Sequence, residues 1–254
     1  MGKVAIVTGA GQGIGYAIAK RLYKDGFQVG LLDFNKETVE MAAKEISETD
    51  TIAVVADVSK RQDVLEAVNK VVEHFGDLSV VVNNAGVGPT DTLETLTEDM
   101  VERTFKINVG GTIWVSQAAL NQFTKLGHGG KIINASSQAG VAGNAGFEVY
   151  SASKFAVRGL TQSWALDLAD KGITVNAYAP GIVKTPMVEK VANELAESAG
   201  KDLDWALSHM AEGVTLKRLS EPEDVANVVG FLAGPDSDYI TGQTIICDGG
   251  MAFH

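Results

Sequence analysis

Residues 4–15 read VAIVTGAGQGIG, and this stretch decides the fold. Its first five residues are mostly β-branched and apolar, which predicts a buried strand over Val4–Thr8. Glycines follow, and apolar residues at helical spacing then predict a helix over Ile14–Lys24. Glycines at this junction let the backbone turn tightly and approach a pyrophosphate, which the free N–H groups and dipole of a helix N-terminus attract. The order strand, glycine turn, helix therefore predicts a dinucleotide site, with a merely structural turn as the alternative.

Along the rest of the chain, short apolar runs alternate with amphipathic stretches, which is typical of repeated strand-helix-strand units. The runs are apolar nearly throughout, as expected when helices cover both faces of a parallel sheet. We predict an α/β fold, a single doubly wound Rossmann-type domain over residues 1–254, with about seven parallel strands and helices on both faces. The predicted strands are Val4–Thr8, Val29–Asp33, Ile52–Ala56, Leu78–Asn83, Lys131–Ala135, Thr174–Ala179 and Thr244–Asp248. The predicted helices are Ile14–Lys24, Lys36–Glu48, Val64–Phe75, Val101–Phe123 and Tyr150–Asp170.

Two more helical stretches, Pro186–Ala199 and Asp202–Glu212, lie before the last predicted strand and have no strand between them. An insertion there lies beyond the carboxyl ends of the strands, where ligands bind in open α/β sheets. We expect residues 186–212 to form a helical substrate lid.

The composition excludes several classes of function. The chain has 254 residues, a formal net charge of −11 and a hydrophobic fraction of 45%. The negative charge disfavours nucleic acid and anionic membrane surfaces, and no run of Lys and Arg offsets it. No apolar stretch reaches the roughly 20 residues needed to cross a bilayer. The single cysteine, Cys247, and a start without a signal-peptide pattern indicate a cytoplasmic protein, and its four scattered histidines give no metal motif.

Asp33 closes the second predicted strand, where a carboxylate can accept both hydroxyls of an adenosine ribose and repel a 2′-phosphate. This position favours NAD over NADP. Gln12 agrees, because no nearby Arg or Lys is offered to a phosphate. The alternative is a turn or helix cap preceding Asn35.

Tyr150 and Lys154 are four residues apart at the start of a predicted helix, so their side chains share one face. A free tyrosine has a pKa of about 10, and a nearby cation favours the phenolate and lowers that pKa. The pair therefore suits proton transfer near neutrality. By itself the spacing is also typical of a solvated helix face.

Together these motifs resemble the short-chain dehydrogenase/reductase family over essentially the whole chain. Its Thr-Gly-xxx-Gly-x-Gly pattern is matched from Thr8, and its Asn, Ser, Tyr and Lys tetrad by Asn108, Ser137, Tyr150 and Lys154. The resemblance implies a hydride-transferring oxidoreductase. Tyr150 would give its proton to a carbonyl oxygen that Ser137 hydrogen-bonds, while Lys154 holds the nicotinamide ribose. Asn108 would anchor a water beside Lys154.

The resemblance also implies which residues bind NAD (NADH) and that the protein forms a homotetramer. Asp57-Val58 and Asn83-Asn84-Ala85-Gly86 match segments around the adenine ring, with ordinary turn chemistry as the alternative for the asparagines. The segment from Pro180 matches the one that packs on the nicotinamide ring. The implied cofactor residues are Gly9, Gln12, Gly13, Ile14, Gly15, Asp33, Asp57, Val58, Asn84, Ala85, Gly86, Tyr150, Lys154, Pro180, Gly181, Val183 and Thr185.

Within the family, residues 127–140, 155–162 and 180–187 are similar to the acetoin and diacetyl reductases, also called butanediol dehydrogenases. Gln138 and Asn144 flank Ser137 and are expected to hydrogen-bond the second oxygen of a vicinal diketone or hydroxyketone, or else to satisfy loop backbone. The substrate-binding residues are then Ser137, Gln138, Asn144 and Tyr150.

Three other functions share these features. A 3-oxoacyl-carrier-protein reductase has the same fold and tetrad, but Asp33 and the acidic balance argue against NADP and an acidic carrier. Another short-chain alcohol dehydrogenase remains open. A non-catalytic NAD sensor has no need of the tetrad.

Overall fold

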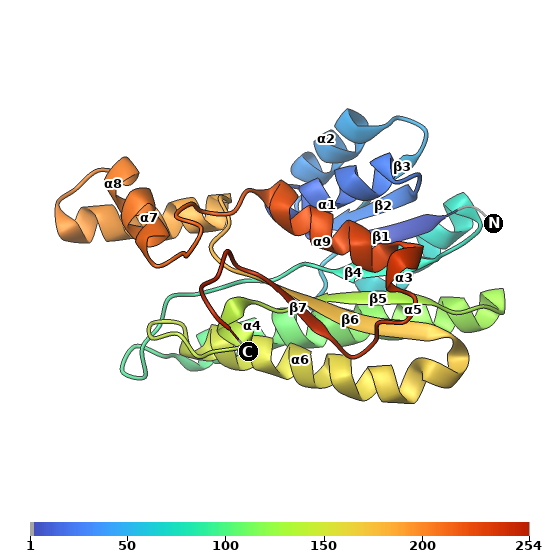
Figure 1. The fold of residues 1–254 in the computed structure, drawn as a ribbon. Coiled ribbons are helices and arrows are strands. Elements are labelled where there is room, and N and C mark those ends of the chain that lie inside the picture. Colours follow the sequence, from blue (N-terminus) through green and yellow to red (C-terminus); the bar gives the residue numbers. More distant parts are fainter. Residues whose placement is uncertain (1–2, 254) are drawn as a thin grey trace.

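The computed structural model describes residues 3–253, and these form one sheet of seven parallel strands in the order β3-β2-β1-β4-β5-β6-β7. The doubly wound α/β prediction is confirmed (Figure 1). The strands are β1 (Val4–Thr8), β2 (Gln28–Asp33), β3 (Thr51–Val55), β4 (Val80–Asn83), β5 (Gly130–Ala135), β6 (Ile173–Pro180) and β7 (Thr244–Cys247). The α-helices are α1 (Gly13–Lys24), α2 (Lys36–Ile46), α3 (Arg61–Phe75), α4 (Glu98–Phe105), α5 (Thr112–Leu126), α6 (Glu148–Leu168), α7 (Pro186–Ala199), α8 (Leu203–Glu212) and α9 (Pro222–Ala233).

Two apolar layers cover the sheet, because successive strand residues point to opposite faces. In β1, Ala5 and Val7 pack with α1, α2 and α9, whereas Val4 and Ile6 pack with α3, α5 and α6. Figure 1 shows α1, α2 and α9 on one side of the sheet and α5 and α6 on the other. Both faces of the central strands are therefore buried, which explains their continuous apolar sequence.

The strand order reverses at β1, which lies between β2 and β4. Helices that follow β1 and β4 run to opposite faces, so a crevice opens at the carboxyl ends of these strands. The glycine turn after β1 and the Asn83–Gly86 segment after β4 both lie at this point.

The predicted helix over Val101–Phe123 is interrupted in the structure. It begins as α4, capped by Thr97, widens into a π-helical turn over Lys106–Gly111, and continues as α5. A Cβ at Gly111 would lie 2.9 Å from Cγ2 of Val58, so the turn packs closely on the loop after β3. Such wide turns are rare and are frequently found at functional sites.

Helix α9 is absent from the elements predicted above, although its start carries a clear signal. Glu221 and Asp224 form a capping box, and Pro222 takes the first helical position. Valine and leucine residues of α9 then complete the apolar layer over α1. The other predicted bounds lie within a few residues of the observed ones.

Helices α7 and α8 project from the body of the molecule (Figure 1). They have a small apolar cluster of their own, built on Ala192, Ala196 and Ala206. Among the described residues, no helix has the length and apolar character to cross a membrane.

Candidate active site

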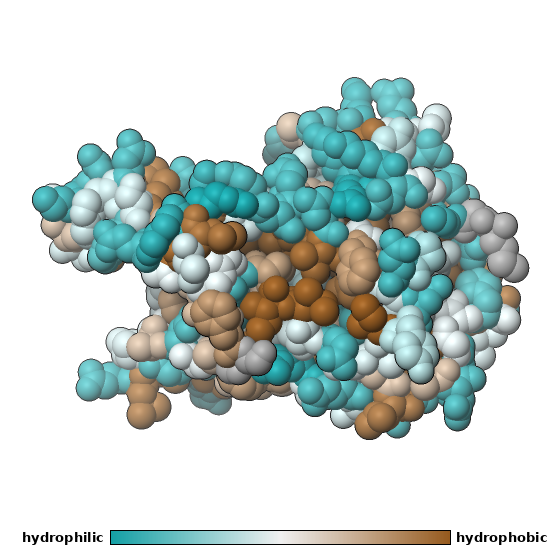
Figure 2. Space-filling model, viewed as in Figure 1, coloured by the Kyte–Doolittle hydropathy of each residue, from teal (hydrophilic) through white to brown (hydrophobic). Residues whose placement is uncertain are grey.

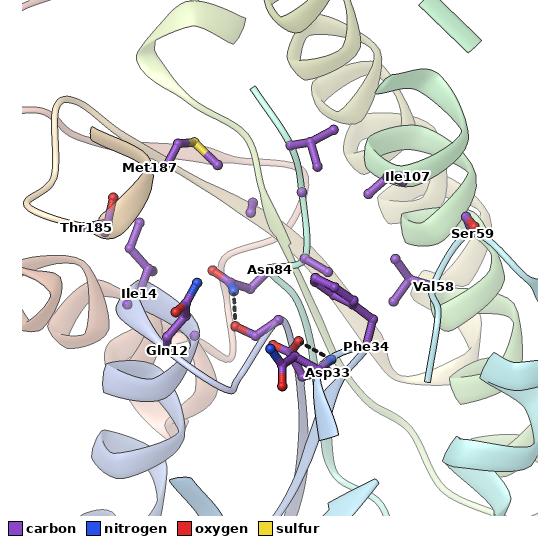
Figure 3. Close-up of a pocket in the computed structure, with 18 of the residues that line it drawn as sticks. Gln12, Ile14, Asp33, Phe34, Val58, Ser59, Asn84, Ile107, Thr185 and Met187 are labelled. Atoms are coloured by element: carbon purple, nitrogen blue, oxygen red, sulfur yellow. Dashed lines mark hydrogen bonds between the residues drawn. The ribbon is translucent and has the colours of Figure 1, made fainter. Parts of the chain in front are cut away.

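A cleft of about 700 Å³ opens at the carboxyl edge of the sheet, at the reversal point beside β1. Its wall runs from Met187 on one side, past Asn84 and Asp33, to Val58 and Ser59 on the other (Figure 3). It brings together most of the residues singled out from the sequence: Gly9, Gln12, Gly13, Ile14, Gly15, Asp33, Asp57, Val58, Asn84, Ala85, Gly86, Tyr150, Lys154, Pro180 and Thr185.

The glycine turn lets backbone segments approach each other more closely than residues with a side chain would allow. Gly9 and Gly13 have φ of 64° and 57°, in the left-handed region that favours glycine. A Cβ at Gly15 would lie 2.0 Å from the carbonyl oxygen of Gly9. Helix α1 starts at this turn, and its N-cap residue Gln12 makes no side-chain capping bond. The helix N-terminus therefore presents free N–H groups to the cleft, as a pyrophosphate requires.

Asn84 joins the end of β4 to this turn. Its Nδ2 donates to the carbonyl oxygens of Thr8 (2.9 Å) and Gly9 (3.2 Å), and its backbone N–H donates to Oγ1 of Thr8. The Tyr178 hydroxyl, from the buried strand β6, donates to Oδ1 of Asn84 at 2.9 Å. Tyr178 was not identified from the sequence. It lies in an apolar strand, and its polar contact is with a residue at the end of β4, two strands away in the sheet.

Asp33 lies at the end of β2 and is 9% exposed. One carboxylate oxygen accepts the N–H of Gly11 and the other accepts the N–H of Asn35, both at 3.0 Å. The turn-capping alternative thus describes part of what Asp33 does. Its carboxylate also faces the cleft, and no described residue forms a salt bridge with it.

Beyond Asp33, the cleft has a flat apolar end. Phe34 is 80% exposed and lines the cleft with Val58 and Ile107 (Figure 3). Asp57 accepts from the Ser59 hydroxyl at 2.7 Å and pairs with Lys60, and these bonds hold its pKa below the usual value against the effect of burial. Phe34, Ser59 and Ile107 were not predicted, although Phe34 directly follows Asp33.

Tyr150 and Lys154 lie together in the wall as predicted, with Nζ of Lys154 5.7 Å from the centre of the Tyr150 ring. Lys154 is 4% exposed and donates to the carbonyl oxygen of Ala135 at 2.8 Å. Burial lowers its pKa to about 8. Burial also raises the pKa of Tyr150, and hydrogen bonding with Ser137 only partly opposes this. The pKa of Tyr150 is thus raised because loss of hydration outweighs its hydrogen bond with Ser137, and the expected lowering by Lys154 is not seen in this structure.

The two adjacent serines have different surroundings. Ser136 lines the cleft, but its hydroxyl donates to the carbonyl oxygen of Lys154 at 3.1 Å. Ser137 is buried, contacts Tyr150 and accepts the N–H of Ala139. Ser137 is thus the serine next to the phenol, in agreement with the tetrad that the family resemblance implies.

Gln138 and Asn144 lie in the loop between β5 and α6, outside the wall of the main cleft. Gln138 is 8% exposed, and within residues 3–253 its side chain makes no hydrogen bond. Asn144 is half-buried and uses only its backbone, donating to the Ser151 hydroxyl. In the part of the chain that the structure describes, neither side chain forms a hydrogen bond with the loop backbone, so the alternative that they serve to hold the loop is not supported.

Asn108 lies within the π-helical turn behind Gly86. Its Oδ1 accepts the N–H of Val87 at 2.8 Å, and its Nδ2 donates to Val87 and to the Ser153 hydroxyl. Its amide thereby ties the loop after β4 to the helix that carries Tyr150 and Lys154. Protein atoms use most of the hydrogen-bonding capacity of the Asn108 amide. The expected role of anchoring a water would not require so many of these bonds.

The segment after β6 reaches the cleft only in part. Pro180 and Thr185 line it, together with Met187, which was not predicted. Val183 is buried in the core, and Gly181 packs so closely on the residue after β7 that a Cβ would lie 2.9 Å from Cα of Asp248. Neither Gly181 nor Val183 forms part of the cleft wall.

Other reactive groups stand apart from the cleft. Burial raises the pKa of the Cys247 thiol to about 12, so it is not a nucleophile near neutrality. No three His, Cys, Asp or Glu side chains between residues 3 and 253 are grouped to hold a metal ion.

Comparison with known proteins places these features in a family. Residues 3–196 match the family profile described as short chain dehydrogenase. The chain is 57% identical to "Diacetyl reductase [(S)-acetoin forming]" of Staphylococcus aureus over 99% of this chain and 98% of that protein. It is 41% identical to L-2,3-butanediol dehydrogenase of Corynebacterium glutamicum, with both chains fully covered. A crystal structure of a variant of actinorhodin polyketide ketoreductase with NADPH superposes with a TM-score of 0.95 at 32% identity, covering 100% and 98% of the two chains.

Proposed function

The chain belongs to the short-chain dehydrogenase family and is an oxidoreductase, and from this premise we propose that it interconverts small vicinal diketones, hydroxyketones and diols with NAD(H). Diacetyl, acetoin and 2,3-butanediol are the substrates that its relatives' names suggest. The observation that carries the proposal is the pairing of Tyr150 with Ser137 and Lys154 beside a cleft that begins at the glycine turn.

The residues of the cleft fit a nicotinamide dinucleotide. The crowded glycines and the uncapped start of α1 suit a pyrophosphate. Asp33 suits a ribose, and Phe34 together with Val58 suits a flat base. Pro180, Thr185 and Met187 would flank the nicotinamide end. When bound, the nicotinamide supplies or accepts the hydride.

The protein's own part of the reaction is proton transfer. With its pKa raised by burial, Tyr150 remains protonated near neutrality and is poised to donate its proton to a carbonyl oxygen. Ser137 would hydrogen-bond the same oxygen as it gains charge. Lys154, whose pKa of about 8 leaves it mostly charged at neutral pH, would stabilise the phenolate left on Tyr150 and bind the nicotinamide ribose.

Asp33 supports NAD as the natural cofactor. Its carboxylate has no cationic partner among residues 3–253, so a 2′-phosphate placed beside it would be repelled without compensation. The NADPH in the structure of the related ketoreductase is the cofactor of that protein and is not evidence about the choice made by this chain.

We propose that Gln138 and Asn144, in the loop that follows Ser137, hydrogen-bond the second oxygen of the substrate. A hydrogen bond between the Gln138 amide and the second oxygen would contribute roughly 1–3 kcal/mol, which corresponds to about ten- to a hundredfold in efficiency over a substrate without that oxygen. A simple ketone lacks that oxygen and should react correspondingly more slowly.

The test compares kcat/KM with NADH for diacetyl, acetoin, 2-butanone and an acetoacetyl thioester, in the wild type and in Gln138→Leu. We expect acetoin and diacetyl to exceed 2-butanone by about ten- to a hundredfold in the wild type, and this preference to collapse in Gln138→Leu.

Thr124→Val is a suitable control, because it removes a polar group from the exposed surface of α5. A faster reaction with the thioester would replace the proposal by a carrier-protein reductase. Equal rates for acetoin and 2-butanone, or an unchanged ratio in Gln138→Leu, would leave Gln138 with a structural role only.

We also propose that the protein forms homotetramers. Strand β7 is a sheet edge whose residues are all partly exposed, and Figure 2 shows an apolar band across the face where β7 lies. An uncovered apolar edge strand invites pairing with another chain, and a second copy of this chain is the occupant we infer. Light scattering coupled to gel filtration tests this, and a monomer at micromolar concentration would contradict it.

A further inference from the structure

The helix that carries Tyr150 and Lys154 lacks a cap of its own. Helix α6 begins at Glu148, and its N-cap residue Phe147 has no side chain able to accept a hydrogen bond. The first N–H groups of a helix need acceptors from outside the helix, and an acidic group is favoured there by the helix dipole. Tyr150 is the third residue of α6, so its position depends directly on this first turn.

The missing acceptor comes from a distant loop. Asp91, between β4 and α4, is 3% exposed, and its Oδ1 accepts the N–H of Glu148 at 2.6 Å. Its backbone N–H donates to the carbonyl oxygen of Gly146 at 2.9 Å, and a β-bridge joins Asp91 to Phe147. One residue thus holds both the start of α6 and the loop before it.

The same two loops form the surroundings of the Tyr150 ring. A Cβ at Gly88, three residues before Asp91, would lie 3.3 Å from Cδ2 of Tyr150 and 3.5 Å from Sδ of Met187. The loop held by Asp91 also carries Asn144. Loosening the Asp91 contacts would therefore let the phenol and its neighbours shift together.

We propose that Asp91 is a positioning residue for Tyr150, acting as an external N-cap of α6. The proposal rests on the proton-transfer role given to Tyr150 above. Catalysis is sensitive to such placement, since a shift of about 1 Å at a reacting group can cost on the order of 100-fold in rate.

The test uses three variants of the full chain. Asp91→Ala removes the cap, and we expect kcat to fall about ten- to a hundredfold while the KM for NADH stays within about threefold. Asp91→Asn keeps an oxygen for the Glu148 N–H and loses no other bond, because Oδ2 of Asp91 has no partner in the described part of the chain. We expect it to retain kcat within about threefold of wild type.

Thr97→Ala is the matched control, since Thr97 lies in the same loop and caps α4 through the N–H of Met100. It should lower the melting temperature as Asp91→Ala does, with kcat unchanged. If Asp91→Ala fails to fold, Asp91→Ser takes its place, because its side chain is one atom shorter and weakens the bond to the Glu148 N–H, and kcat should again fall.

The proposal is overturned if Asp91→Ala melts lower but keeps wild-type kcat, or if Asp91→Asn loses as much activity as Asp91→Ala. Tyr150→Phe, measured alongside, separates the two levels of inference. An active Tyr150→Phe would refute the proposed function itself, whereas an inactive Tyr150→Phe with a fully active Asp91→Ala would refute only the positioning role.

Discussion

Replacing Asp33 by Asn should change which nicotinamide dinucleotide the protein uses. The substitution removes one negative charge at the end of β2 and keeps the size of the side chain. One carboxylate oxygen of Asp33 accepts the N–H of Gly11 and the other that of Asn35, so one of these bonds is lost as well. A modest fall in stability, of about 1 kcal/mol, should accompany the change.

The effect on cofactor choice is larger. A 2′-phosphate about 5 Å from the carboxylate is repelled by roughly 3 kcal/mol at an effective dielectric constant of about 20, and the 9% exposure of Asp33 limits further screening by water. Roughly 3 kcal/mol corresponds to a factor of about 100 to 300 in kcat/KM. In Asp33→Asn we therefore expect the NADH-to-NADPH preference to fall by about 100-fold, mostly through faster reaction with NADPH.

The assay is the initial rate of ketone reduction at varied NADH or NADPH, giving kcat/KM for each. Asp25→Asn is the matched control, because it removes the same charge at the far end of α1, where Asp25 pairs with Arg21. A wild type that prefers NADPH, or an Asp33→Asn ratio equal to that of Asp25→Asn, would refute the reasoning.

Three further predictions concern Tyr150, the expected lid over residues 186–212 and a distant ion pair. Tyr150→Phe should lower kcat at least about 1,000-fold with NADH affinity nearly intact, which stopped-flow turnover and fluorescence titration measure; lost NADH binding would indicate damage instead. Residues 186–212 pack mainly on their own small cluster, so their amide hydrogen exchange should slow when NADH and substrate are added; exchange already slow without ligands contradicts a lid. Both ring nitrogens of His128 face acceptors, the carbonyl of Gly129 and Asp77, and its pKa is raised above 6.5. Its stabilisation is full below pH 6.5 and is lost as pH rises through the raised pKa, so His128→Gln should lower the melting temperature by about 2–4 °C at about pH 6 and by less at about pH 9; an equal loss at both would refute this.

Much of the fold follows from local sequence. Continuous apolar runs such as Val4–Thr8 reflect burial on both faces, and helical spacing in Pro186–Ala199 gave the bounds of α7 as observed. The glycine turn likewise has its meaning in neighbouring residues, because tight turns and helix starts are local structures. Even α9, which was not predicted, carried a local signal in Glu221, Pro222 and Asp224.

Other features arise only when distant segments meet. The π-helical turn around Asn108 depends on packing against Val58 and on bonds to Val87 and Ser153, which periodicity cannot reveal. The raised pKa of Tyr150 comes from burial by the folded chain and opposed the expectation drawn from its spacing to Lys154.

The sequence by itself determined the strand-turn-helix order, the acidic end of β2 and the tetrad residue types, because each is written in adjacent or periodically spaced residues. The tertiary structure decided which groups hold that tetrad in place. Asp91 caps Glu148 across 57 residues, and Tyr178 reaches Asn84 across 94. A hydrogen bond depends on atoms lying about 3 Å apart in space, and for segments so far apart along the chain only the packed sheet and helices fix that distance.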